Sequence, residues 1–175
     1  MKAERLVFLD ESGVSTALSH GQAWSPSGER AVVIAPIRAK KLTLIGAIAV
    51  DGIRGTMEVE GSMDGDAFKL FLDERLGPNL RPGDIVVMDR LRAHQVSGVE
   101  AILAKWGASA LYLPPYSPEY NPIEICWAWI KRYLRKVAPS SFARLRAIMS
   151  TAWVQVTPAL CKSWAAHCGY ALAST

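Results

Sequence analysis

The sequence predicts an α/β protein built on one mixed β-sheet with helices on both faces of that sheet. Strand-like apolar runs come first and are separated by turn signals, as in antiparallel strands. Later apolar runs alternate with helical patterns, which is typical of parallel strands, and the C-terminal part is helical. The length of 175 residues suits one domain, so we expect a single domain over residues 1–175.

The composition is that of a folded domain. Hydrophobic residues make up 50% of the chain and charged residues 21%, which excludes a disordered polypeptide. The formal net charge of +4 permits a nucleic-acid partner without requiring one. No signal peptide, no apolar run of the roughly 20 residues that cross a membrane and no CxxC pair are visible. We therefore expect a reduced, cytoplasmic chain.

Four strands are predicted in the first third of the chain. The first, at residues 5–9, ends at Asp10, and a Ser-, Gly- and Pro-rich stretch at residues 12–30 follows as a loop or a loosely paired hairpin. Asp51-Gly52 is a turn signal between the last two strands. The other three strands are predicted at residues 31–35, 42–50 and 56–60.

Helices and strands alternate from there. Asp64 can cap a helix to about Leu76, and the continuous apolar run at residues 85–88 suits a central parallel strand that ends at Asp89. A helix at 96–106 and a strand at 110–113 follow. Two more helices are expected, one capped by Ser140 or Ser141 and one that starts at Thr157-Pro158 and runs to about Cys168.

A proline-rich stretch leads into the longest helix. Four prolines between residues 114 and 122 forbid regular structure, so residues 114–121 are expected to form a kinked loop. Asn121 is placed as the N-cap of the next helix and Pro122 at its first position. Glu124 then lies in the first turn, where Asn-x-x-Glu alone reads as a capping box.

Three carboxylates are expected to converge. Asp10 and Asp89 follow strands that become neighbours at the centre of the predicted sheet, and the helix that carries Glu124 packs beside them. Carboxylate oxygens suit Mg²⁺, and a pair of such ions serves phosphoryl transfer. Glu11 is the alternative to Asp10, although strand alternation turns the two side chains to opposite faces.

Basic side chains lie on the helix line that continues from Glu124. Lys131 and Arg135 either hold a phosphate backbone or form a solvated basic face near the end of the helix, which the helix dipole favours. Further along, Cys161, Trp164 and Cys168 share one helical face and are expected in the core rather than at a zinc site.

Three motifs carry a resemblance to a known family. They are FLDESGVS from Phe8, IVVMDRLRAH from Ile85 and LPPYSPEYNPIEICWAWIK from Leu113. Together they resemble the DDE transposases of the mariner superfamily, with the bacterial insertion-sequence branch as the closest match. Between Asp89 and Glu124 lie 34 residues (124 − 89 − 1), the spacing for which that family is known.

The resemblance covers residues 7 to about 171 and implies both fold and function. It implies a ribonuclease-H-like fold with a mixed five-stranded sheet, antiparallel in its first three strands and then parallel, and a helical C-terminal tail. Asp10, Asp89 and Glu124 would be the catalytic ligands of Mg²⁺ or Mn²⁺, with two ions expected. The implied reaction is DNA cleavage and strand transfer at element ends, by a homodimer bound to element-end and target DNA near a bacterial nucleoid.

The sequence departs from the family pattern in two places. Asp89 is followed by Arg90-Leu91-Arg92-Ala93-His94, where the family usually has Asn-Leu-Ser-x-His. Arg92 and His94 are candidate DNA contacts, although His94 equally suits a structural role. No N-terminal helix-turn-helix region is recognisable, so a separate DNA-reading subunit is expected. The alternative is a catalytically weak remnant that only associates with DNA.

Overall fold

One mixed sheet forms the centre of the computed structural model, which describes residues 3–17, 25–30 and 40–171. Within the described residues the strand order is β3-β2-β1-β4-β5. The pairs β3–β2 and β2–β1 are antiparallel, whereas β1–β4 and β4–β5 are parallel, which confirms the predicted fold class. The strands are β1 (Leu6–Ser15), β2 (Lys41–Ala49), β3 (Gly52–Glu60), β4 (Ile85–Met88) and β5 (Ser109–Tyr112).

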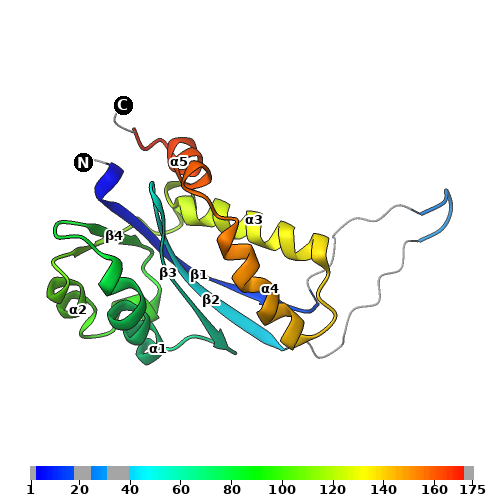
Figure 1. The fold of residues 1–175 in the computed structure, drawn as a ribbon, viewed down its shortest axis with the longest axis horizontal. Helices are drawn as coiled ribbons and strands as arrows, with labels where there is room; N and C mark the ends of the chain where they lie inside the picture. Colours follow the sequence, from blue (N-terminus) through cyan, green and yellow to red (C-terminus); the bar gives the residue numbers. More distant parts are fainter. Residues whose placement is uncertain (1–2, 18–24, 31–39, 172–175) are drawn as a thin grey trace.

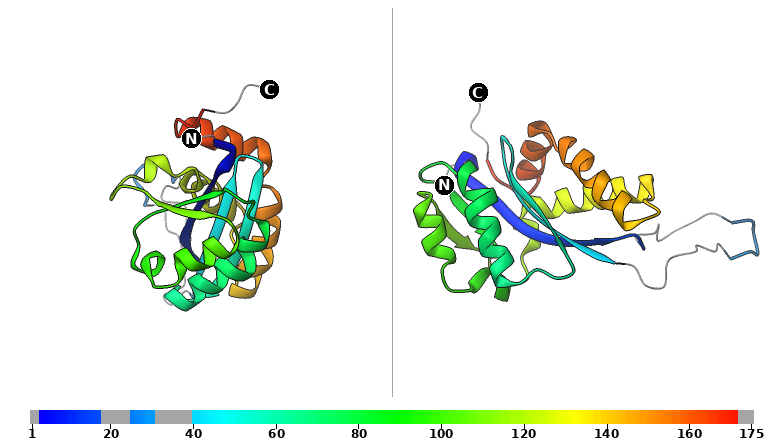
Figure 2. Two further views of the ribbon diagram at one scale, coloured as in Figure 1. Left: turned by 90° about the vertical axis from the view of Figure 1, so that its left-hand side faces the viewer. Right: turned by 60° about the horizontal axis from the view of Figure 1, so that its bottom comes forward.

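Helices cover both faces of this sheet. Helices α3, α4 and α5 lie on one face, and α1 and α2 lie on the other (Figures 1 and 2). A π-helical turn over Phe71–Leu76 continues α1, and short 3-10 turns cover Arg92–Gln95 and Pro118–Tyr120. The helices are α1 (Gly65–Leu70), α2 (Val99–Lys105), α3 (Pro122–Val137), α4 (Phe142–Val154) and α5 (Pro158–His167).

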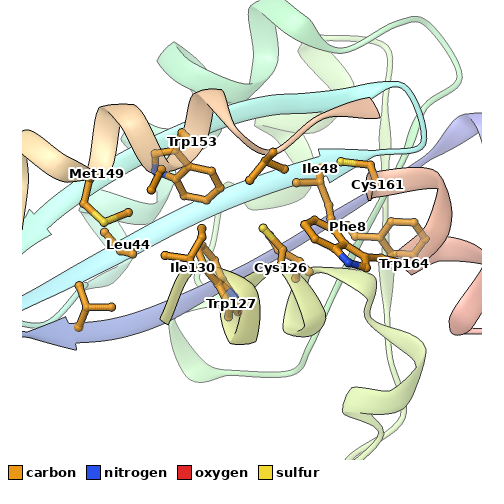
Figure 3. Close-up of a cluster of buried hydrophobic side chains, with 14 of the residues drawn as sticks. Phe8, Leu44, Ile48, Cys126, Trp127, Ile130, Met149, Trp153, Cys161 and Trp164 are labelled. Carbon is orange, nitrogen blue, oxygen red and sulfur yellow. The ribbon is translucent and has the colours of Figure 1, made fainter. Parts of the chain in front are cut away.

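Each face of the sheet has its own hydrophobic core, because successive side chains of a strand point to opposite sides. On the α3 face, Phe8 and Leu44 pack with three tryptophans from α3, α4 and α5 (Figure 3). On the α1 face, Leu9 and Ile45 pack with phenylalanines and leucines of α1 and its continuation. We call these the tryptophan face and the phenylalanine face.

A glycine lets the helices of the tryptophan face approach the sheet. Trp127 of α3 and Trp153 of α4 meet edge to face, with ring centroids 5.5 Å apart. A Cβ at Gly46 of β2 would lie 2.9 Å from a ring atom of each indole, closer than packed atoms approach. The missing side chain therefore sets how near α3 lies to the strands.

The helix caps and the Asp51-Gly52 turn confirm their predictions. The side chains of Asp64, Ser141 and Thr157 accept backbone hydrogen bonds at the starts of α1, α4 and α5. Gly52 has φ +128°, which a residue with a side chain rarely adopts.

Three predicted boundaries were wrong. The strand predicted at residues 56–60 begins at Gly52, because Gly52, Ile53 and Gly55 already pair with β2. β1 continues through Asp10 to Ser15, because its partner β2 offers an antiparallel ladder as far as Lys41. The helix expected from residue 96 starts at Val99, because Val96 is extended and Gly98 has φ +96°. The strand predicted at 31–35 and much of the loop predicted at 12–30 lie outside the described residues.

The C-terminal cysteines lie where the core interpretation puts them. Cys161 and Trp164 are buried in the tryptophan-face core, and Cys168 is partly buried. In the part of the chain that the structure describes, no helix combines the length and apolarity that membrane crossing requires.

Candidate active site

Asp10, in β1, and Asp89, directly after β4, come from neighbouring strands. The parallel pairing of β1 with β4 sets Leu6, Val7 and Phe8 opposite Ile85, Val86 and Val87. Continuing this register by two residues brings Asp10 level with Asp89. Since Phe8 and Val87 belong to the tryptophan-face core, strand alternation turns both aspartates towards the face covered by α3.

Two long-range hydrogen bonds fix the end of the proline loop, and with it the start of α3. The Asn121 side chain donates from Nδ2 to the carbonyl oxygen of Leu9 at 3.4 Å. The hydroxyl of Tyr170 donates to the carbonyl oxygen of Tyr120 at 2.7 Å. Glu124, in the first turn of α3, is thus held in place relative to β1.

The capping role predicted for this segment was wrong in its details. Asn121 occupies the N-cap position, but its side chain makes no cap hydrogen bond and reaches β1 instead. Its backbone N–H donates to Pro118 at 2.9 Å, so the reciprocal bond of a capping box has no donor for Glu124 to accept. The Glu124 carboxylate therefore makes no capping bond and lines the pocket instead.

The three predicted carboxylates line one pocket of about 570 Å³. The proline loop forms much of its wall, and Tyr116, at φ +56° and fully exposed, stands at its rim. Among residues 3–17, 25–30 and 40–171, no three His, Cys, Asp or Glu side chains lie close enough together to hold a metal ion. Asp10, Asp89 and Glu124 share the pocket without forming a finished coordination cage.

Asp10 is a buried carboxylate that accepts a hydrogen bond from a neutral indole. Its side chain is buried, and the indole Nε1 of Trp127 donates to Oδ2 at 3.0 Å. Burial, with the neighbouring carboxylates of Glu11 and Glu124, raises the pKa of Asp10 to about 7, although the hydrogen bonds from Trp127 and the Glu11 backbone act in the opposite direction. The sequence analysis gave Trp127 no part in the site. Its position three residues after Glu124, and the need of a buried indole N–H for an acceptor, were the available signals.

Glu124 is exposed to the pocket and shares this surplus of negative charge. Burial of part of its side chain raises its pKa, Lys131 lowers it, and Asp89 and Glu11 raise it. The influence of Lys131 places this lysine near the carboxylates, one turn before Arg135 on α3. Both basic side chains are partly exposed, which fits either interpretation of them.

Asp89 is held by a histidine. Its Oδ1 accepts the backbone N–H of Leu91 at 2.9 Å and lies 2.7 Å from Nδ1 of His94, whose Nε2 lies 2.9 Å from Oε2 of Glu11. Burial opposes the charge on His94, but its two carboxylate partners outweigh burial and raise its pKa to about 9. The hydrogen bond from His94 lowers the pKa of Asp89.

This arrangement corrects the prediction that His94 contacts DNA. The ring is fully buried and packs on Phe68 with centroids 4.5 Å apart, so no nucleic acid reaches it in this conformation. It also gives Glu11 a role on the face opposite Asp10, which sequence reasoning missed because 83 residues separate the pair.

The two arginines after Asp89 differ in position. Arg90 lines the pocket, with its guanidinium carbon 5.9 Å from the centre of the Tyr112 ring. Arg92 is exposed at the start of a 3-10 turn and is not part of the pocket wall.

The chemistry of the donor set fits a hard divalent cation. Three carboxylates line one pocket, and burial together with neighbouring carboxylates raises the pKa values of Asp10 and Glu124, an effect that a bound cation would offset. Oxygen ligands of this type are those that Mg²⁺ and Mn²⁺ take.

A mixed sheet in the order 3-2-1-4-5, with acidic side chains where its central strands meet a helix, defines a ribonuclease-H-like protein. Residues 5–146 match the family described as DDE superfamily endonuclease, and the chain belongs to that family. A search of curated proteins gave no match.

Solved structures of a mariner transposase share this fold. The Mos1 transposase paired-end complex with left transposon end has a TM-score of 0.78 at 16% identity over 94% of this chain and 52% of that one. The Mos1 mariner paired end complex with Mn has a TM-score of 0.78 at 15% identity, over 94% of this chain and 54% of that one. The catalytic domain of Mos1 mariner transposase has a TM-score of 0.71 at 16% identity, over 94% of this chain and 76% of that one. The chain thus spans about half the length of the Mos1 chains in the two complexes, and the low identity speaks for the fold alone.

Proposed function

We propose that this chain is the catalytic domain of a DDE transposase of the bacterial insertion-sequence branch of the mariner superfamily. Its reaction is divalent-metal-dependent cleavage of DNA at element ends and transfer of the freed strand to target DNA. One observation carries the proposal: Asp10 and Asp89 lie level on adjacent strands, and Glu124 enters the same pocket from α3.

Asp10, Asp89 and Glu124 are the residues that would hold the metal. Bound Mg²⁺ or Mn²⁺ activates an attacking oxygen and stabilises a leaving one in phosphoryl transfer. Among the structures with this fold, the Mos1 paired end complex was determined with Mn and with Mg, which supports the choice of metal.

The protein's own side chains position these ligands and receive the DNA. Trp127 orients Asp10, and the Asn121 bond to β1 fixes the helix turn that carries Glu124. We assign Lys131 and Arg135 of α3 to contacts with a phosphate backbone, and the electrostatic influence of Lys131 on Glu124 supports this assignment. With a net charge of only +4, the chain alone is expected to bind DNA weakly and without sequence choice.

The proposed partners are element-end and target DNA, a second copy of the chain in the DNA complex, and a DNA-reading subunit encoded separately. The similar Mos1 structures are transposase complexes with transposon ends, which supports the choice of DNA.

The test is cleavage of supercoiled plasmid in Mn²⁺ by the parent and by Glu124→Ala. We expect the parent to nick the plasmid and Glu124→Ala to lose at least about 100-fold, since it removes one ligand of the proposed site. Glu119→Ala is the matched control, because Glu119 is an exposed carboxylate of the same loop that does not line the pocket. Equal nicking by the parent and Glu124→Ala would remove the proposal.

A second candidate function is DNA association without turnover. Oδ1 of Asp89 is already engaged, Arg90 adds a positive charge to the pocket, and in the described residues no three ligands stand together. This candidate predicts salt-sensitive DNA binding with no cleavage at any Mn²⁺ concentration, whereas the transposase proposal predicts both.

A further inference from the structure

A chain of three side chains, with a buried histidine at its centre, runs from β1 to Asp89. Glu11 lies 2.9 Å from Nε2 of His94, and Nδ1 of the same ring lies 2.7 Å from Oδ1 of Asp89. The His94 side chain is fully buried, whereas Glu11 is 19% and Asp89 51% exposed. The ring therefore spans the space between a carboxylate on one side of β1 and a carboxylate beside the pocket.

The ring is held at one face and at both nitrogens. Phe68 packs on its face, and the two carboxylates take its nitrogens. The hydroxyl of Tyr112 donates to the backbone carbonyl oxygen of His94 at 3.1 Å. An imidazole whose two nitrogens both face carboxylate oxygens donates in both directions, so its orientation is set from two ends.

Asp89 is held at one oxygen only. Oδ1 takes the His94 contact and the backbone N–H of Leu91. Oδ2 has no hydrogen bond within the described part of the chain, and Asp89 lines the pocket. The carboxylate is thus oriented at one oxygen, while the other remains available to a ligand.

We propose that Glu11 and His94 form a brace that positions Asp89 for metal binding. The inference rests on the proposed function, because it assigns Asp89 as a metal ligand. Strand alternation in β1 divides the adjacent acids: Asp10 faces the pocket as a ligand, and Glu11 faces the opposite side and anchors His94. Both are positioning residues, since neither lines the pocket.

Two alternatives make different predictions. If His94 only fills space, its loss costs stability and leaves metal affinity unchanged. If His94 withholds Asp89 from the metal, its loss raises metal affinity. A brace predicts lower affinity, because partners that orient a ligand typically contribute 10- to 100-fold to metal binding.

The test is Mn²⁺ binding to the whole chain, followed by electron paramagnetic resonance, with Mg²⁺ added as a competitor. We expect His94→Ala to weaken Mn²⁺ binding by roughly 10- to 100-fold. We expect Mg²⁺ binding to weaken more, because Mg²⁺ demands near-ideal octahedral geometry and suffers more from a displaced ligand. This widening of the gap between the metals is a readout that lost packing does not produce.

Glu11→Ala supplies the second variant, because it removes the far anchor and leaves the ring in place. It should weaken Mn²⁺ binding in the same direction, and it carries the test should His94→Ala fail to fold. Leu72→Ala is the control for lost packing, since Leu72 is fully buried in the same core as Phe68, on which His94 packs.

The brace is overturned if Glu11→Ala binds Mn²⁺ within twofold of the parent, if affinity rises, or if Leu72→Ala loses as much. Asp10→Ala separates this failure from that of the proposed function. Parent binding that Asp10→Ala abolishes, together with a silent Glu11→Ala, removes the brace alone. A parent that binds no Mn²⁺ removes the metal site and the brace with it.

Discussion

The two faces of the sheet hold the two strand aspartates by different chemistry. On the tryptophan face, a neutral indole of α3 donates to the buried Asp10 and leaves its negative charge uncompensated. On the phenylalanine face, a buried histidine paired with Glu11 donates to Asp89. Burial and the neighbouring carboxylates raise the pKa of Asp10 to about 7, whereas the hydrogen bond from His94 lowers the pKa of Asp89. The pKa values of two neighbouring carboxylates are thus shifted in opposite directions.

The largest expected effect is the loss of Trp127. Trp127→Ala should lower the free energy of unfolding by about 3–5 kcal/mol, because it leaves a cavity in the tryptophan-face core. Trp127→Phe keeps most of the volume but removes the donor to Asp10, and should cost about 1–3 kcal/mol. Urea denaturation of both variants separates packing from the hydrogen bond. A Trp127→Phe variant as stable as the parent would show that the indole N–H contributes nothing.

The next effect is a pH dependence that belongs to Asp10. Because its folded pKa of about 7 lies above the ordinary 3.8, the folded state keeps the proton longer than the unfolded state does. Its contribution to stability is complete below about pH 4 and falls as pH rises towards 7. Asp10→Asn should remove this fall and gain on the order of 2–4 kcal/mol over the parent at pH 8.

Thermal unfolding of the parent and Asp10→Asn from pH 4 to pH 8 checks this sign. Mn²⁺ should raise the melting temperature of the parent more than that of Asp10→Asn, since a ligand of the native state stabilises by mass action. A stability difference between the two proteins that does not change with pH would contradict the assignment to Asp10.

A glycine substitution on each face gives the third effect. Gly46→Ala would press on Trp127 and Trp153 and should cost about 1–3 kcal/mol. Gly55→Ala would place a Cβ 3.0 Å from the carbonyl oxygen of Arg75 on the other face, with a similar cost. Only Gly46→Ala should also weaken Mn²⁺ binding, because it displaces the helix that carries Glu124.

Gly13→Ala is the control, as its Cβ would meet only the flexible Lys41 side chain, and it should be nearly neutral. Mn²⁺ titration and urea denaturation of the three variants decide the matter. Weaker Mn²⁺ binding in Gly55→Ala would show that the faces are not independent.

The smallest expected effect concerns Arg90. Its fixed charge in the pocket wall repels a cation, so Arg90→Asn should raise Mn²⁺ affinity by roughly threefold and weaken DNA binding slightly. Arg92→Ser, outside the wall, should leave Mn²⁺ affinity unchanged. Lower cleavage and lower DNA affinity in Arg90→Asn would instead identify a phosphate contact. Fluorescence anisotropy with a DNA duplex measures the DNA affinity.

Local patterns predicted most of the fold. The continuous apolar run at Ile85–Met88 gave a central parallel strand, and the caps Asp64, Ser141 and Thr157 gave three helix starts. The extension of β1 beyond Asp10 was missed because acidic, serine and glycine residues carry no strand signal. Pairing with β2 supplies the stabilisation there.

The site could be predicted in its members but not in its supports. That three carboxylates share one pocket could be predicted, because each stands in a short recognisable motif. Trp127 is 117 residues from Asp10 and His94 is 83 from Glu11, so only the folded sheet brings these partners together. A tryptophan at helical spacing and a histidine five residues after an aspartate each have too many structural roles for sequence alone to choose.

The bonds that hold Tyr120 and Asn121 have a consequence for how this family's members can vary. Two hydrogen bonds position the start of α3, one from Asn121 to Leu9 of β1 and one from Tyr170 to Tyr120. The position of Glu124 therefore depends on these bonds and not on the number of residues that separate it from Asp89. The number of residues between Asp89 and Glu124 therefore does not determine how far apart the two side chains lie across the pocket. Exposed segments between the two acids, such as the end of α2, can gain or lose residues without moving Glu124, provided that both hydrogen bonds remain.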